Sequence, residues 1–77
     1  MNAKETIVNL ISSIFEVSVE DVTMESSIGD FPKWDSLGHM NLMTAIQDEL
    51  DIEFEPEEMI EIEDVEDIVK LVESKLD

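Results

Sequence analysis

The chain has 77 residues, with four basic side chains against 21 acidic ones and a formal net charge of −17. This charge argues against binding to nucleic acid or to anionic membrane surfaces, because their phosphate groups would repel the chain. It favours partners with lysine- and arginine-rich patches, although acidity can also serve solubility alone. The length suits one small domain over residues 1–77, and the charge favours a monomer.

The sequence contains no cysteine, which excludes disulfides, thiolate metal sites and a cysteine nucleophile. The absence of cysteine fits a reducing compartment. No apolar run approaches the roughly 18 residues of a membrane helix, and the first residues lack the basic region of a signal peptide. We therefore expect a cytoplasmic protein without membrane insertion. A single histidine and no ligand-spaced metal cluster argue against a free-standing enzyme.

The first predicted element is a helix over residues 3–15, in which apolar residues recur at helical spacing, with Asn2 as its N-cap. Residues 16–33 form a long connection. Within it, Ser18 is expected to cap a short helical turn, and Gly29 is expected to adopt a positive φ. Further apolar side chains of the connection are expected to pack under that turn or to pin the loop to the bundle, namely Val19, Val22, Met24, Ile28 and Phe31.

A second helix is predicted from Ser36 to about Leu50. Its apolar stripe consists of Leu37, Met40, Met43, Ile46 and Leu50, widened by Leu42 and Ala45. Gly38 is a weak helix former that costs about 1 kcal/mol relative to alanine. Its position in the first turn suggests that something approaches the helix start closely.

The last part of the chain predicts two more helices. Residues 51–54 are extended, and Pro56 then starts a short helix. A fourth helix follows a cap at Glu63 or Asp64. The residues expected to be buried here are Met59, Ile60, Ile62, Val65, Ile68, Val69, Leu71 and Val72. The predicted fold class is therefore all-α, a small helical bundle of three main helices and one short helix with a long first loop.

Ser36 lies where an exposed loop meets the predicted start of the second helix. The first N–H groups of a helix lack internal partners and the helix dipole is positive there, so a phosphate ester on Ser36 would be well tolerated. Asp35 or Ser36 could instead simply cap the helix, and the two roles are compatible. The local residues leave both interpretations open.

Asp35-Ser36-Leu37 stands at the entry to a helix, followed at fixed spacing by Leu42, Ala45, Ile46 and Leu50 and then by Asp51-Ile52-Glu53-Phe54. In this register, continued through Glu57-Glu58, Ile62 and Val65, the chain resembles the acyl carrier protein family over nearly its whole length. The resemblance implies that Ser36 carries 4′-phosphopantetheine, transferred from coenzyme A by a separate magnesium-dependent transferase. The thiol of this arm would hold acyl groups as thioesters, and the chain itself would have no catalytic residues.

The resemblance also implies partners: a phosphopantetheinyl transferase, an acyl- or aminoacyl-activating enzyme, and downstream transferases or synthases. The residues expected to contact them are Asp35, Leu37, Gly38, Met40, Asn41 and Asp48. The family's recognition helix usually carries acids just after the serine, whereas Gly38, Asn41 and Gln47 are neutral here. The sequence Trp34-Asp35-Ser36-Leu37-Gly38-His39 is more similar to stand-alone carriers of specialised pathways.

Two alternatives remain open from the sequence. One is an aminoacyl or peptidyl carrier of a nonribosomal or surface-polysaccharide pathway. The other is a structural acidic adaptor in which Ser36 is only a helix cap. Trp34 is expected to pack the loop rather than to contact a partner, and His39 is expected to be solvated or to cap rather than to bind a phosphate or a partner. Met40, Met43 and Met59 are expected in a core that could part for a short acyl chain.

Overall fold

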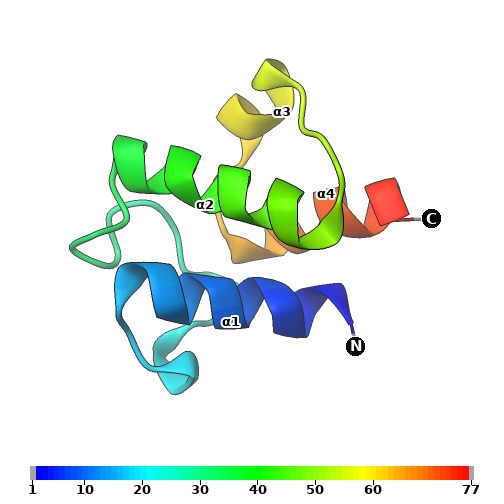
Figure 1. Cartoon of the computed structure of the whole chain (residues 1–77). Coiled ribbons are helices and arrows are strands. Elements are labelled where there is room, and N and C mark those ends of the chain that lie inside the picture. Colours follow the sequence, from blue (N-terminus) through cyan, green and yellow to red (C-terminus); the bar gives the residue numbers. More distant parts are fainter. Residues whose placement is uncertain (1, 77) are drawn as a thin grey trace.

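The computed structural model of the chain describes residues 2–76. It contains α1 (Ala3–Phe15), the 3₁₀-helix η1 (Val19–Asp21), α2 (Ser36–Leu50), α3 (Pro56–Glu61) and α4 (Val65–Leu76). Figure 1 shows α1 and α2 lying side by side in opposite directions, with the short α3 beyond α2. The predicted all-α bundle with three main helices and one short helix is confirmed.

The core lies among α1, α2 and α4, and the loop before α2 closes it. Burial of each large apolar side chain in such a core stabilises the fold by roughly 1.5–3 kcal/mol. The largest side chains with no exposed surface are Ile7 and Ile11 of α1, Leu42, Met43 and Ile46 of α2, Val65, Ile68 and Val72 of α4, and Trp34 of the loop.

Local capping explains where the helices begin. The side chain of Asn2 accepts the N–H of Glu5 at 2.7 Å, as predicted. The carboxylate of Asp64 accepts the N–H of Asp67 at 2.9 Å, and α4 starts at the next residue, Val65. Pro56 is the first residue of α3, where its missing N–H costs nothing. These caps are properties of short sequence stretches, which is why the predicted helix starts were correct.

One predicted cap and several predictions of buried side chains were wrong. Ser18 precedes η1, but its side chain makes no capping hydrogen bond. Five apolar side chains lie on the surface instead of in the core: Val19 (48% exposed), Ile28 (43%), Leu37 (71%), Met40 (46%) and Ile60 (82%). The physical reason is that η1 and α3 are too short to be covered on all sides, and α2 presents a wider apolar stripe than α1 and α4 cover. Val22 is buried, and Met24 and Phe31 pack against the core, as predicted.

The long connection is ordered by backbone hydrogen bonds to the start of α4. The N–H of Val65 donates to Ser26 O at 2.9 Å, and the N–H of Glu66 donates to Met24 O at 3.0 Å. Gly29 has the predicted positive φ of 97°, and its N–H donates to Trp34 O at 2.8 Å. The connection is therefore anchored at α4 before it turns towards α2, and this path sets the position of the residues just before Ser36.

No helix among residues 2–76 has both the length and the apolar character needed to cross a membrane.

Candidate functional site

Ser36 is the first residue of α2, and its side chain is exposed. The cap of α2 is Asp35, whose carboxylate accepts the N–H of Gly38 at 2.8 Å. Within residues 2–76, the hydroxyl of Ser36 makes no hydrogen bond with another protein group. The alternative in which Ser36 only caps the helix is therefore wrong, because Asp35 already fills that role. The hydroxyl is left available at the positive end of a 15-residue helix.

Gly38 is required by a close approach of the preceding loop. A Cβ added at Gly38 would lie 2.1 Å from the carbonyl oxygen of Lys33 and 3.1 Å from Cε1 of Phe15. Only a residue without a side chain lets the loop cross the helix at this distance. The predicted close approach is thus a contact inside the protein. Gly38 is buried under the loop, which leaves it little surface for the direct partner contact expected of it.

Trp34 fixes the loop by aromatic stacking. Its side chain has no exposed surface, and its ring centroid lies 5.3 Å from that of Phe15 and 6.1 Å from that of Phe31, in stacked orientations. Such pairs add about 0.5–1.5 kcal/mol beyond the burial of their area. The prediction that Trp34 packs the loop is confirmed. Because Ser36 follows only two residues later, the stack also positions the start of α2.

His39 is buried, with 5% of its surface exposed, so the expected solvated role was wrong, and the start of α2 is capped by Asp35 and not by His39. Its Nδ1 accepts a hydrogen bond from Nε1–H of Trp34 at 3.1 Å, and its Nε2 lies 3.4 Å from the carbonyl oxygen of Met59. The ring faces inwards because Trp34 and α3 supply a partner for each nitrogen. Burial lowers the pKa of His39 below its ordinary value of 6.5, and the hydrogen bond to Met59 opposes this only in part.

We expect the stability of the chain to fall as the pH drops below about 6.5. With the pKa of His39 lowered in the folded state, the unfolded chain binds more protons between the folded-state pKa and 6.5. The stabilisation is therefore complete above 6.5 and is lost as the pH falls to the folded-state pKa. Urea unfolding at pH 7.5 and at about pH 5.5 measures this effect. The control is His39→Asn, which does not titrate, and an equal pH response in both proteins would contradict the expectation.

A largely apolar cavity of about 400 Å³ lies beside Ser36, between α2 and α3. This volume is within the range of about 300–1,000 Å³ that is usual for small-molecule sites. Of the methionines expected in the core, only Met43 is buried there, whereas Met40 and Met59 line this cavity. The cavity borders the core, because the core residue Ile62 and Met59, which packs against the core, both line it. The lining residues are Ile28, Ser36, His39, Met40, Pro56, Met59, Ile60 and Ile62.

The sequence analysis missed part of this cavity. Ile28 and Ile60 were predicted to be buried, and Pro56 was noted only as a helix start. The sequence did hold a signal that His39 is buried. The weak helix former Gly38 beside it indicated that the start of α2 is closely covered. No local pattern indicated that α3 would face Ser36, since that depends on the path of residues 51–55.

Comparison with known proteins adds to this geometry. The family model described as the phosphopantetheine attachment site matches residues 5–72. The acyl carrier protein of Coprothermobacter proteolyticus is 31% identical over 68 residues, which cover 88% of this chain and 83% of that protein. The chain belongs to the acyl carrier protein family. The chain is also similar to the solution structure of holo acyl carrier protein from Geobacter metallireducens, with a TM-score of 0.86 and 30% identity over 99% of this chain and 87% of the other.

This acyl carrier protein tethers acyl groups on a covalently attached 4′-phosphopantetheine arm. The arm supplies a thiol on which an acyl group is held as a thioester. The structure fits such a group: an available hydroxyl lies at a helix N-terminus, where a phosphate is favoured, and an apolar cavity lies beside it. Carriers of this type work with synthases and transferases and are generally not catalytic themselves.

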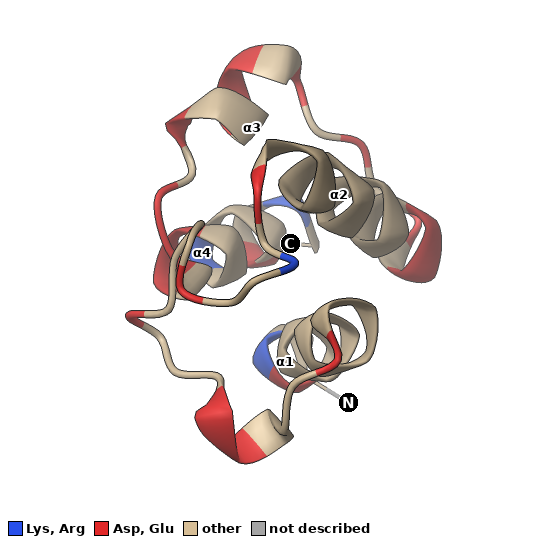
Figure 2. Ribbon diagram, turned by 90° about the vertical axis from the view of Figure 1, so that its left-hand side faces the viewer, with Lys and Arg blue, Asp and Glu red and all other residues tan. Residues whose placement is uncertain are grey.

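The part of α2 that begins at Ser36 carries no charged side chain over its first twelve residues. Residues 36–47 contain no Asp, Glu, Lys or Arg. In Figure 2, acidic residues (red) mark α3, η1, the connecting segments and the C-terminal end of α2, while most of α2 is tan. Of the residues expected to contact partners, Asp35, Leu37, Met40, Asn41 and Asp48 are exposed. Only Asp35 and Asp48, near the two ends of α2, bring charge to this set.

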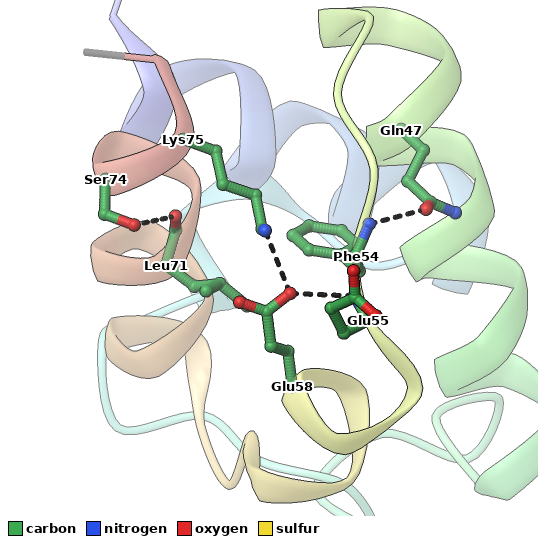
Figure 3. Close-up of polar contacts among 7 residues, drawn as sticks. All are labelled: Gln47, Phe54, Glu55, Glu58, Leu71, Ser74 and Lys75. Atoms are coloured by element: carbon green, nitrogen blue, oxygen red, sulfur yellow. Dashed lines mark hydrogen bonds and ion pairs between the residues drawn. The ribbon is translucent and has the colours of Figure 1, made fainter.

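A polar network holds α3 against α4 (Figure 3). Nζ of Lys75 lies 2.9 Å from Oε1 of Glu58, which also accepts the N–H of Glu55 at 2.7 Å. These contacts lower the pKa of Glu58, the backbone N–H of Glu55 contributing most. Gln47 of α2 accepts the N–H of Phe54 at 2.8 Å and so anchors the segment that leads into α3.

Proposed function

We propose that Ser36 is the residue that carries the 4′-phosphopantetheine arm, and that the chain presents acyl groups to partner enzymes from this position. The observation that supports this proposal most is the exposed Ser36 hydroxyl at the first position of α2, with the capping role taken by Asp35. The apolar cavity that Ser36 itself lines offers space for part of the arm or a short acyl chain. The proposed carrier domain comprises residues 1–77.

The proposal assigns the chemistry of attachment to a separate enzyme. A serine hydroxyl needs a base to become a nucleophile. His39 is one turn away, but its Nδ1 accepts from Trp34 and its Nε2 faces the Met59 carbonyl, so neither nitrogen is directed to Ser36. We therefore infer that a phosphopantetheinyl transferase supplies the base and the metal ion, and that this chain contributes no catalytic residue.

The same proposal extends to the other partners. An acyl- or aminoacyl-activating enzyme and downstream transferases or synthases would contact the exposed residues around Ser36, with Leu37 and Met40 as apolar contacts and Asp35, Asn41 and Asp48 as polar ones. Leu37 is 71% exposed and Met40, three residues later on the same helix, is 46% exposed, so the two side chains offer adjacent apolar surface. A cytoplasmic location, where coenzyme A and these enzymes would be available, stays a prediction.

Intact-mass measurement tests the attachment residue. The chain is incubated with coenzyme A, Mg²⁺ and a broad-specificity phosphopantetheinyl transferase, alongside Ser36→Ala. We expect the parent chain to gain the mass of one phosphopantetheine group and Ser36→Ala to gain none. The matched control is Ser13→Ala, which changes an exposed serine of α1 and should load as the parent does. A mass gain in folded Ser36→Ala, or none in the parent, would rule the proposal out.

A further inference from the structure

His39 lies between two parts of the proposed site that are distant in the sequence. Its Nδ1 accepts the indole N–H of Trp34, which precedes Ser36 by two residues, at 3.1 Å. Its Nε2 lies 3.4 Å from the carbonyl oxygen of Met59 in α3. The ring also stacks on Trp34, with 6.3 Å between the centroids. One side chain thus connects the loop before Ser36 with the helix that forms the other part of the cavity.

The two partners of His39 require one tautomer. The indole nitrogen of tryptophan can only donate, so Nδ1 of His39 must be unprotonated to accept from it. The proton of the neutral ring is then on Nε2, which can donate to the carbonyl oxygen of Met59. The other tautomer, and the doubly protonated ring, would place two donors against each other at Trp34. Only the Nε2–H form satisfies both contacts.

The carbonyl of Met59 lacks its usual helical partner. The helix α3 has six residues, none of them fully buried. The last carbonyl groups of a helix find no N–H donor within the helix itself. The N–H four residues after Met59 belongs to Glu63, and it donates instead to Oδ2 of Asp67 at 3.1 Å. His39 therefore supplies a donor to the end of α3. The ion pair between Glu58 and Lys75 of α4 provides a second attachment of α3.

We propose that His39 is a positioning residue that links the loop before Ser36 to α3 through the Nε2–H tautomer of its imidazole. The link fixes the α3 side of the cavity relative to Ser36, where the arm enters. The inference rests on the proposed function only for the role of Ser36. The link itself can be tested in the unmodified chain, so its failure and a failure of loading at Ser36 are told apart.

Two substitutions separate the two contacts. In His39→Asn, the side-chain oxygen can occupy the position of Nδ1 and accept from Trp34, but no group reaches Met59. In His39→Gln, the longer amide can place its NH₂ near the position of Nε2 and donate to Met59, while the acceptor for Trp34 is lost. The measurements are the NMR signal and exchange rate of the Trp34 indole N–H, and the hydrogen exchange of amides in the second half of α3. Amides of Ile11 and Ile68, in the core of α1 and α4, report global stability.

We expect the two variants to have opposite effects on the two contacts. His39→Asn should keep the protected indole N–H and raise exchange in α3 about two- to tenfold relative to the core amides, the factor that one hydrogen bond typically contributes. His39→Gln should do the reverse. If both variants behave alike, or change exchange uniformly in all helices, His39 only fills space and the proposal is overturned. The ¹⁵N shifts of His39 in the parent chain give a test that needs no variant, because a proton on Nδ1 at neutral pH would also overturn it.

Discussion

Replacing Trp34 with alanine is expected to destabilise the chain by about 3–5 kcal/mol, the usual cost of removing a buried aromatic side chain. The side chain has no exposed surface and stacks on Phe15 and Phe31. The substitution also leaves Nδ1 of the buried His39 without its donor. A domain of this size has a total stability of only a few kcal/mol, so a large fraction of the variant would be unfolded under native conditions. Urea unfolding followed by far-UV circular dichroism measures the loss.

The graded control is Trp34→Phe. Phenylalanine keeps an aromatic ring in the stack but lacks the indole N–H, so we expect a smaller loss than with alanine. The control thereby separates packing from the hydrogen bond to His39. Fluorescence cannot follow these variants, because Trp34 is the only tryptophan of the chain. A Trp34→Ala variant within about 1 kcal/mol of the parent would show that the stack does not hold the loop.

Gly38→Ala should destabilise the chain although alanine is the better helix former. Helix propensity alone would favour alanine by about 1 kcal/mol. The new Cβ, however, would lie 2.1 Å from the carbonyl oxygen of Lys33, and a backbone atom cannot move aside as the end of a side chain can. Overpacking of this kind costs about 1–3 kcal/mol or more. We expect a net loss of stability in urea unfolding, with slower loading of Ser36 because the loop before it must shift.

The matched control for Gly38→Ala is Asn41→Ala. Asn41 lies about one turn further along α2 and is exposed, so alanine there gains helix propensity without a clash. The two substitutions should therefore change stability in opposite directions. If Gly38→Ala were as stable as Asn41→Ala, the loop would have to be free to move away from α2, and the close approach would not fix the start of the helix.

The helix starts could be predicted because they depend on neighbouring residues. Asn2, Asp35 and Asp64 accept N–H groups three residues ahead of them, and Pro56 fits only the first turn of a helix. For Ser36 the neighbouring residues left both interpretations open, and the structure assigns the cap of α2 to Asp35. The apolar period also placed α1, α2 and α4 correctly.

The cavity and the role of His39 could not be predicted in this way. Both depend on α3, which is positioned by contacts between distant residues: Met59 with His39, Glu58 with Lys75, and Phe54 with Gln47. Periodicity shows that a residue such as Ile60 is on a helix, but not whether another helix covers it. In a chain this short there is little material to cover every apolar residue, so such errors concentrate in α3 and at the start of α2.

Because residues 36–47 carry no charged side chain, the long-range attraction of a partner and its final docking depend on different parts of the surface. The field of a chain with net charge −17 attracts a basic partner over a distance of about one Debye length. The acidic side chains that produce this field lie outside residues 36–47, so attraction alone does not orient the partner towards this part of α2. The final contact there is made by uncharged groups such as Leu37 and Met40. Ionic strength therefore governs how fast a partner arrives, while the lifetime of the docked complex depends on apolar fit.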